Sequence, residues 1–448
     1  MVKHRSVAAS VQVVPDRGRG ASHAGGVLVQ GLCDRLGLTD AIRAVFGPHG
    51  PLKICRGSVM RDLAVSIADG GEAMTAVEML RSQSAVFGKV ASDTTVGRMI
   101  DEFNAERRIG FYASLAAART RVWESGRVDL PRLLAVDVDA SQVICHTAKE
   151  GASGTYKKAF GFMPIICSLD QTREPLAILQ RSGSDSPKSA ADQLQALFMG
   201  LAQLPERAFD RSLHQIVVRI DSAGYAHEIV DTLTSHALDF VIGANLTDAV
   251  WAQIDALDEG AWVPAIDQDG IEREHAAVAE LPAPDGWGDG VRLIVRREIA
   301  GAGAKLSLVD TDGYRRQVLI TNLPDTDIAY IAALYCGRGR AEQIIDELKR
   351  CGLGKLPAKA WEHNEAWICT ALLAATLLRW SQMLLLDGHW QRVRIGTLRN
   401  YLLHTAARIT SHARRLRIHF DPTWPAYQTI VRAFERLTQI PTTPLQLA

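Results

Sequence analysis

The chain has 448 residues, of which 47% are hydrophobic and 22% are charged. This length exceeds what one hydrophobic core usually serves, so we expect two or three domains of a soluble globular protein. Lys and Arg balance Asp and Glu at 50 each, which counts mildly against a nucleic-acid partner.

The charge is nevertheless uneven along the chain. Residues 391–448 carry nine Arg against two acidic residues, a net charge of about +7, and residues 1–130 sum to about +4, which leaves the centre near −11. Basic flanks around an acidic centre suit a protein that binds phosphate at its edges and cations in the middle. The alternative is a plain fluctuation of surface charge.

The seven cysteines are scattered and include no C-x-x-C pair. This disfavours a disulfide framework and a cysteine zinc site, and it indicates reduced thiols in a cytoplasmic protein. The N-terminus has no apolar stretch of the signal-peptide kind. The most apolar stretch, 368–378, is too short to span a bilayer and predicts a buried helix, with no membrane association.

In chain order, residues 1–25 are rich in Gly, Ser, Arg and His and predict a mobile tail. Residues 26–128 show apolar residues three and four apart, which predicts a helical domain. The arginines of this domain either lie on a helix that enters a DNA groove or are ordinary solvated side chains of a helical bundle.

From Pro131 the pattern becomes an alternation of strands and helices, which predicts an α/β core over 129–257 and 323–388. Residues 258–322 form short alternating runs separated by Gly and Asp, including 304–310, and predict a β-rich insertion in that core. Residues 389–448, with their Arg-rich stretch around 398–419, predict a basic helical C-terminal region.

Acidic residues end two of the predicted strands. Asp137 and Asp139 are two apart in LLAVDVDAS, so they project from one face of a strand and repel each other unless a cation or water lies between them. Asp221 closes HQIVVRI, at the carboxyl end where α/β proteins place ligand-binding groups. A single Asp in this position also commonly caps the following helix, so neither strand is decisive by itself.

A helix is predicted over YCGRGRAEQIIDELK, where Tyr335, Arg338, Glu342 and Lys349 are spaced by three, four and seven residues. At about 100° per residue, these side chains lie within roughly 60° of one another. They form either a solvent-facing stripe with an Arg338–Glu342 ion pair or one side of a functional site.

The spacing Tyr335-(2)-Arg338-(3)-Glu342-(6)-Lys349 resembles the signature of DDE transposases from bacterial insertion sequences. Asp139-Ala140-Ser141 and Arg219-Ile220-Asp221-Ser222 resemble the first two carboxylate blocks of that family. HTAKEGASGTYKKAFGFMPI resembles a segment of its group 1 branch, with Met163 in place of an expected His. Ser184 stands in place of an expected Asn.

The resemblance implies an α/β fold with an RNase H-like catalytic core, a β-rich insertion, an N-terminal helical domain and a C-terminal helical segment. It implies a metal-dependent polynucleotidyl transferase whose catalytic and metal-binding residues are Asp139, Asp221 and Glu342. Asp137 is the accessory group, and Tyr335, Arg338 and Lys349 contact the DNA backbone.

Two Mg²⁺ or Mn²⁺ ions would suit a site made of carboxylates, because hard ions prefer oxygen ligands. Such ions, about 3.5–4 Å apart, activate the attacking oxygen and stabilise the leaving oxygen of an in-line displacement. Water would first free a 3′-hydroxyl, and that hydroxyl would then attack target DNA.

The resemblance also implies double-stranded DNA as partner, with terminal inverted repeats bound by residues 26–125, a homodimer on DNA, and a place at the bacterial nucleoid. Three alternatives remain open: a catalytically inactive DNA-binding protein derived from a transposase, a stand-alone RNase H-like nuclease, and a haloacid-dehalogenase-like phosphatase. The departures at Met163 and Ser184 point towards an inactive copy, whereas the intact set of three carboxylates argues against one. The phosphatase would use Asp137 as nucleophile. This alternative does not explain the helical spacing of the side chains from Tyr335 to Lys349.

Overall fold

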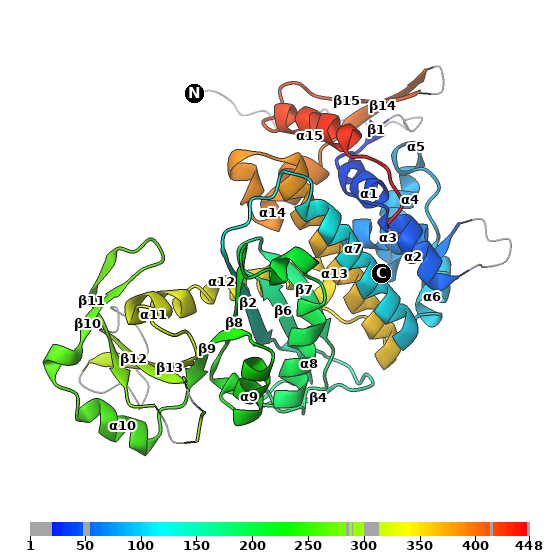
Figure 1. Cartoon of the computed structure of the whole chain (residues 1–448). Helices are drawn as coiled ribbons and strands as arrows, with labels where there is room; N and C mark the ends of the chain where they lie inside the picture. The colour runs from blue at the N-terminus through cyan, green and yellow to red at the C-terminus, as the bar shows by residue number, and fades with distance from the viewer. Residues whose placement is uncertain are drawn as a thin grey trace, which may run out of the picture.

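The structure is a computed structural model of the chain, and it describes residues 20–47, 54–283, 286–288, 290–299, 313–412 and 415–445. It has a mixed α/β fold, with a large sheet, helices on both faces of that sheet, and a layer of helices beyond them (Figure 1). The predicted mobile tail falls largely on 1–19, outside the described residues. Within it, Gly20–Ala21 forms strand β1, so the prediction is wrong for this end of the segment.

The five strands at one end of the sheet carry the predicted carboxylates. Their order is β7-β6-β2-β8-β9, with β2, β8 and β9 parallel and β6 antiparallel to both β2 and β7. These strands are nearly continuous apolar runs because helices cover both of their faces. Their bounds are β2 Leu133–Ala140, β6 Ile165–Leu169, β7 Glu174–Leu179, β8 Gln215–Ile220 and β9 Asp239–Ala244.

The predicted β-rich insertion extends this sheet instead of forming a separate module. Strand β13 pairs antiparallel with β9, and β12, β11 and β10 follow outward, which gives nine strands in all within the described residues. The predicted strand at 304–310 lies outside the described residues. The elements here are α10 Asp248–Asp255, η5 Glu259–Ala261, β10 Val263–Ile266, β11 Glu272–Leu281, β12 Arg292–Ile299 and β13 Tyr314–Thr321.

Two sets of helices cover the two faces of the sheet. Helix α8 (Ala190–Leu201) packs on β6 and β7, and α9 (His227–Ser235) packs on β9. On the other face, α11 (Ile328–Cys336) packs on β9 to β12 and α12 (Gly339–Leu348) packs on β6 and β7. Short elements complete this part: β3 Val143–Ile144, β4 Ser153–Gly154, β5 Phe160–Phe162, η3 Glu206–Phe209, η4 Ser222–Gly224 and the π-helical turn η6 Lys349–Leu353.

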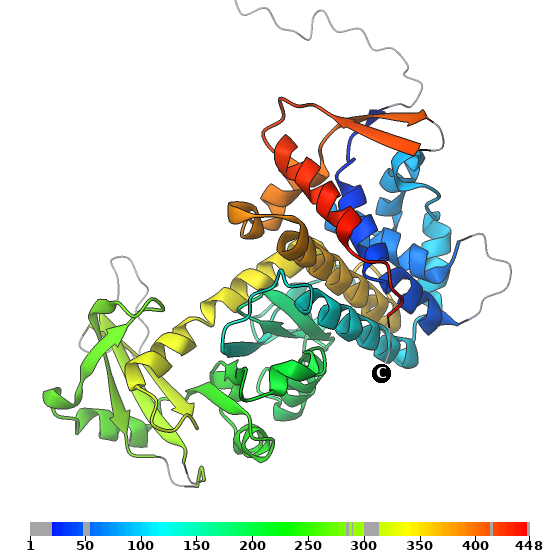
Figure 2. The same cartoon turned by 45° about the horizontal axis from the view of Figure 1, so that its top comes forward.

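The long helix α13 (Trp361–Leu385) is the central helix of the fold. It packs against β7 on one side and against α1, α3, α7 and α15 on the other (Figure 2). By length and composition it could cross a membrane, but 94% of its most apolar window is buried inside the protein. The stretch 368–378 is therefore part of a buried core helix, as the sequence predicts.

The described part of residues 26–123 is helical and surrounds α13. Helices α6 and α7 are separate, because the side chain of Asn104 accepts a hydrogen bond from the backbone N–H of Arg107 and caps α7. The helices are α1 Gly26–Arg35, α2 Leu38–Phe46, α3 Arg56–Ala68, η2 Met74–Ala76, α4 Val77–Ser82, α5 Ser84–Phe87, α6 Asp93–Asp101 and α7 Ala105–Trp123.

The prediction of a wholly helical C-terminal region is wrong. The Arg-rich stretch forms a hairpin of β14 and β15, and β14 also pairs with β1. Ile409 is buried while Arg408 and Ser411 are exposed, and such near-alternation suits a half-buried strand and not a helix. The elements are η7 Gly388–Gln391, α14 Ile395–Leu398, the π-helical turn η8 Arg399–Leu403, β14 Ala407–His412, β15 Arg415–Phe420 and α15 Tyr427–Gln439.

Candidate active site

Asp139 lies near the end of β2, with 18% of its side chain exposed. Burial raises the pKa of Asp139, the nearby guanidinium of Arg338 lowers it, and the carboxylates of Asp221 and Glu342 raise it. A carboxylate affects the pKa of another only when the two are close. The three predicted metal ligands, 82 and 121 residues apart in sequence, therefore gather at one edge of the sheet.

Asp221 follows the last residue of β8 and uses its two carboxylate oxygens differently. One oxygen, Oδ1, accepts a hydrogen bond of 2.9 Å from the backbone N–H of Ala223 and caps the turn η4. The other, Oδ2, lies 3.8 Å from Nη2 of Arg338. The capping interpretation of this residue is therefore confirmed, and its role as a metal ligand stays a prediction.

Arg338 bridges the first two carboxylates. Its Nη2 atom lies 3.1 Å from Oδ2 of Asp139 and 3.8 Å from Oδ2 of Asp221. Within the described part of the chain these are its ion-pair partners, and the alternative of a surface Arg338–Glu342 pair does not occur. The Arg338 side chain is 14% exposed and lies between two carboxylates, so it does not belong to a solvated stripe.

Glu342 lies in the first turn of α12, one turn beyond Arg338, and its side chain is exposed. It makes no hydrogen bond or ion pair with another described residue. The predicted single helix is in fact two, α11 and α12, joined by a tight turn in which the N–H of Arg338 bonds to the carbonyl of Tyr335 at 2.9 Å. We call Asp139, Asp221, Arg338 and Glu342 the carboxylate edge.

Tyr335 does not lie where the sequence predicted it. Its side chain is only 6% exposed and packs in a core cluster with Val217 and Val241. A Cβ added to Gly243 would come within 2.6 Å of the Tyr335 hydroxyl, so this glycine leaves room for the phenol. Burial raises the pKa of Tyr335 to about 12. A direct contact with DNA does not fit this burial, and Tyr335 instead packs behind the carboxylate edge.

Lys349 begins the π-helical turn η6 and is half-buried. Burial lowers the pKa of Lys349, the nearby ammonium of Lys157 lowers it further, and Asp346 and Asp139 act in the opposite direction. The Asp139 contribution places this lysine beside the carboxylate edge. Lys157 belongs to the turn between β4 and β5, so a second cation borders the same region.

Asp137 shares its strand face with Asp139 but lies below the surface, fully buried. Its two carboxylate oxygens accept hydrogen bonds of 2.7 and 2.6 Å from Nε and Nη2 of Arg219. Arg219 also donates to Asp170 at 2.9 Å and to the carbonyl of Leu334 at 2.7 Å. Arg340 completes the network with two bonds of 2.5 Å to Asp170.

We call Asp137, Arg219, Asp170 and Arg340 the buried cluster. Burial raises the pKa of Asp137 to about 6, against the opposing effect of Arg219. Arg219 thus holds Asp137 within this network, and the role of Asp137 as an accessory group stays a prediction. Through Arg219 and Arg340 the cluster ties α11 and α12 to the sheet, and this orients Arg338 and Glu342.

The sequence reasoning missed Asp170 and Arg340 as members of this cluster. The available signal was Arg219, a charged residue inside the apolar run IVVRI, because a buried charge requires a partner. The identity of that partner could not be inferred, since Asp170 lies 49 residues away in sequence.

The two departures from the group 1 pattern have structural roles. Met163 is fully buried, and its N–H donates to the carbonyl of Arg181. Ser184 donates its N–H to the hydroxyl of Ser153 at 2.7 Å, next to strand β4. Both residues support the small sheet β3-β5-β4, and in the described residues neither makes a hydrogen bond to the carboxylate edge.

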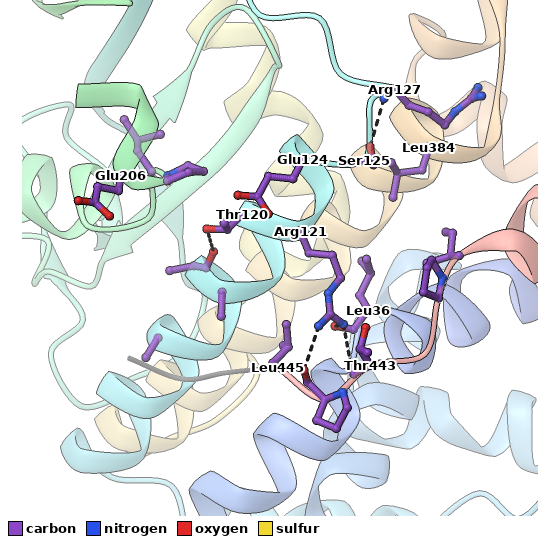
Figure 3. Close-up of a pocket in the computed structure, with 18 of the residues that line it drawn as sticks. Leu36, Thr120, Arg121, Glu124, Ser125, Arg127, Glu206, Leu384, Thr443 and Leu445 are labelled. Atoms are coloured by element: carbon purple, nitrogen blue, oxygen red, sulfur yellow. Dashed lines mark hydrogen bonds between the residues drawn. The ribbon is translucent and has the colours of Figure 1, made fainter. Parts of the chain in front are cut away.

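A cavity of about 1070 Å³ lies away from these residues, between α7, the 204–206 loop and the C-terminal segment (Figure 3). Arg121 spans it and donates to the carbonyls of Leu36 and Thr443 at 3.0 and 2.7 Å. None of the predicted catalytic residues lines this cavity. The hydrogen bond from Arg121 to Thr443 attaches the C-terminal segment to α7.

The family model described as Transposase DDE domain group 1 matches residues 3–442. The chain therefore belongs to this family of transposases. No curated protein matches the chain. Among solved structures, the chain is similar to the piggyBac transposase in a synaptic complex with hairpin DNA, with a TM-score of 0.43 and 10% identity over 88% of this chain and 82% of that chain.

Proposed function

We propose that this transposase cleaves DNA at the ends of an insertion sequence and joins those ends to target DNA, with Asp139, Asp221 and Glu342 as the metal-binding triad. The observation that carries the proposal is the bridging guanidinium of Arg338. It draws the ends of two strands and the start of α12 into one group, although their residues lie far apart in sequence.

The donor set fits hard divalent ions. All three groups are carboxylates, and no imidazole or thiol is among them, which matches the preference of Mg²⁺ and Mn²⁺ for oxygen. Burial is the main cause of the raised pKa of Asp139, and the carboxylates of Asp221 and Glu342 add a repulsion that a cation would relieve. Two ions would be held, with Asp139 as the shared ligand and with Asp221 and Glu342 binding one each.

When bound, the ions would activate the attacking oxygen and stabilise the leaving oxygen of an in-line displacement at phosphorus. Arg338 would exchange its contacts with Asp139 and Asp221 for a phosphate oxygen of the DNA. Lys349 would contact a neighbouring phosphate, and its half-buried position makes its charge less screened than that of a surface lysine. Both cations then offset charge that develops in the transition state.

The five strands β7-β6-β2-β8-β9 would form the RNase H-like core of this enzyme. Their mixed order places the ends of the neighbouring parallel strands β2 and β8 at one edge, where Asp139 and Asp221 lie. Double-stranded DNA would be the substrate. Residues 26–128 would bind the terminal inverted repeats, and a homodimer would hold two ends together.

The test is a cleavage and joining assay on a duplex that carries the inverted repeat flanking the gene, with Mg²⁺ or Mn²⁺ and the unmodified protein. Glu342→Gln and Asp221→Asn should abolish both reactions while DNA binding survives. The matched control is Asp346→Asn, which changes a carboxylate one turn further along α12 that pairs with Arg350 and Arg394. This variant should retain activity.

Other outcomes separate the alternatives. Specific binding without cleavage by the unmodified protein would indicate the inactive DNA-binding protein, with Met163→His and Ser184→Asn as the first reversions. Cleavage without joining would indicate the stand-alone nuclease. Activity that survives in Glu342→Gln would remove the triad from the proposal.

A further inference from the structure

A second cluster of ionisable side chains lies where the C-terminal hairpin meets the N-terminal helices. Nδ1 of His23 lies 2.6 Å from Oδ2 of Asp69, and Nε2 of His404 lies 3.2 Å from Oδ1 of the same carboxylate. The three ligand atoms all lie within 4.8 Å of one another. Among the described residues, this is the group of three His, Cys, Asp or Glu side chains whose possible ligand atoms all lie within that distance of one another.

The three residues come from three separate segments of the chain. His23 lies between β1 and α1, Asp69 directly follows α3, and His404 directly follows η8. The backbones are already adjacent, because the N–H of Ala24 donates to the carbonyl of Thr405 at 3.1 Å. The cluster is therefore fixed by the fold and does not depend on one mobile loop.

The carboxylate of Asp69 is not fully satisfied. Its side chain is 3% exposed, and its Oδ1 atom accepts no hydrogen bond, because Nε2 of His404, although 3.2 Å away, bonds to the backbone carbonyl of Asp69 at 2.9 Å instead. A buried carboxylate oxygen without a partner is costly, and it usually marks an absent water or ion. Arg399 lies close by, but it donates to the carbonyls of Ala68 and Ile67 and not to this oxygen.

We infer that His23, Asp69 and His404 bind a divalent transition-metal ion of the Zn²⁺ class. Zinc takes imidazole nitrogen and carboxylate oxygen at about 2.0–2.2 Å, so tetrahedral ligands lie roughly 3.3 Å apart. The 3.2 Å between Nε2 of His404 and Oδ1 of Asp69 is close to that spacing, whereas the 2.6 Å hydrogen bond between Nδ1 of His23 and Oδ2 of Asp69 would lengthen on binding. The two imidazoles are 25% and 33% exposed, which leaves water access for a fourth ligand.

Binding requires a defined proton arrangement. Each imidazole must be neutral and carry its proton on the other ring nitrogen, Nε2 in His23 and Nδ1 in His404. The carboxylate of Asp69 must be ionised. Binding replaces the hydrogen bonds of His23 Nδ1 to the Asp69 carboxylate and of His404 Nε2 to the Asp69 carbonyl, and the displaced protons go to solvent or to the second ring nitrogen.

This site is distinct from the carboxylate edge in its chemistry. Imidazole nitrogen favours Zn²⁺, whereas a site made only of carboxylates favours Mg²⁺. An ion held by these three residues would connect the segment before α1, the end of α3 and the start of the hairpin strand β14. It would stabilise the attachment of the small sheet β1-β14-β15 to the helices, independently of catalysis.

The experiment is a titration of the full-length, chelator-treated protein with Zn²⁺. The buffer contains excess Mg²⁺, which saturates the carboxylate edge. Calorimetry should give one Zn²⁺ per chain, and the melting temperature should rise on binding. His23→Gln and His404→Gln should each weaken binding by about 100-fold and remove the thermal shift. His363→Gln, at a half-exposed histidine that pairs with Asp101 elsewhere, is the matched control and should bind normally.

Unchanged affinity in both cluster variants would assign the zinc to other groups, such as cysteines, and would overturn the inference. So would the absence of binding to the unmodified protein at pH 8, which would leave a hydrogen-bonded His–Asp–His cluster only. Circular dichroism of each variant before titration shows whether it is folded. None of these readouts depends on transposition activity.

Discussion

The buried cluster and the carboxylate edge are built from the same residue types, two positions apart on the same three elements. On β2, Asp137 belongs to the buried cluster and Asp139 to the carboxylate edge. At the end of β8, Arg219 belongs to the buried cluster and Asp221 to the carboxylate edge. On α12 and the turn before it, Arg340 belongs to the buried cluster and Arg338 to the carboxylate edge. Residues only two positions apart in sequence thus have different surroundings.

Charge and burial explain this difference. The buried cluster pairs two arginines with two aspartates, so its charges cancel and nearly all of its donors have partners. The carboxylate edge has three carboxylates against Arg338, with Lys349 at its margin, and it is open to solvent. Excess negative charge in a partly exposed group is what a cation can neutralise, whereas a neutral buried group can only hold the fold together.

The largest effect is expected from Arg219→Gln in the buried cluster. It leaves the carboxylates of Asp137 and Asp170 buried without this partner, and such losses cost about 3–5 kcal/mol of the free energy of unfolding. Urea denaturation at pH 7.5 measures it. The folded pKa of Asp137, about 6, exceeds its unfolded value of 3.8, so the stabilising effect of its protonation is present in full below pH 3.8 and is lost as pH rises through 6.

The deficit of Arg219→Gln should therefore be smaller at pH 5 than at pH 7.5. Arg340→Gln is the control, because Arg340 is 37% exposed and Asp170 keeps Arg219 as partner. A loss in Arg340→Gln as large as in Arg219→Gln would contradict the role of burial.

The next effect is expected from Arg338→Gln at the carboxylate edge. If Arg338 meets a phosphate in the transition state, the cleavage rate should fall by about 10²–10³-fold. The free energy of unfolding should change by no more than about 1 kcal/mol, because solvent partly screens this pair. A loss of unfolding free energy as large as that of Arg219→Gln would show that the carboxylate edge stabilises the fold as much as the buried cluster does.

Metal binding gives a smaller effect that distinguishes the two groups by pH. At ten times its dissociation constant, Mg²⁺ should stabilise the protein by about 1.4 kcal/mol, and Glu342→Gln should remove this increment. The pKa of Asp139 is raised by burial and by its acidic neighbours, so protons compete with Mg²⁺ at higher pH than at an ordinary aspartate. Thermal shifts at pH 5 should therefore be weaker than at pH 8, and equal shifts would contradict the assignment.

The smallest effect is expected at an ion pair that is exposed on both sides. Arg81 bonds to Glu78 one turn away in α4, and each side chain is about half exposed. Arg81→Gln should change the free energy of unfolding by less than about 0.5 kcal/mol. This value gives the baseline against which the buried arginines are compared by the same urea denaturation.

The sequence predicts the local part of this site well and its distant partners poorly. Local patterns predict that Asp139 and Asp221 lie at strand ends and Glu342 on a helix, because each depends only on residues close in sequence, and the family resemblance selects these three as metal ligands. The burial of Tyr335 depends on Gly243, and the role of Asp137 depends on Arg219. Such pairings are set by tertiary packing, which helical spacing alone cannot reveal.

The same limit applies to the fold. The α/β alternation and the β-rich segment were recognisable, but the pairing of β13 with β9, which merges them into one sheet, is a contact between distant segments. The sequence prediction of a helix at the hairpin β14–β15 is wrong, because it rests on the Arg-rich composition of this stretch. The alternation around Ile409 was the signal that indicated a strand.

The position of α13 has a consequence for synthesis of the chain. Helices α1, α3 and α7 pack against α13, and β1 pairs with β14. These N-terminal elements, which are synthesised early, therefore pack against residues 361–412, which are synthesised later. The N-terminal helices thus lack their apolar partner until most of the chain has been translated. The N-terminal helices therefore reach their final packing only after residues 361–412 have been synthesised.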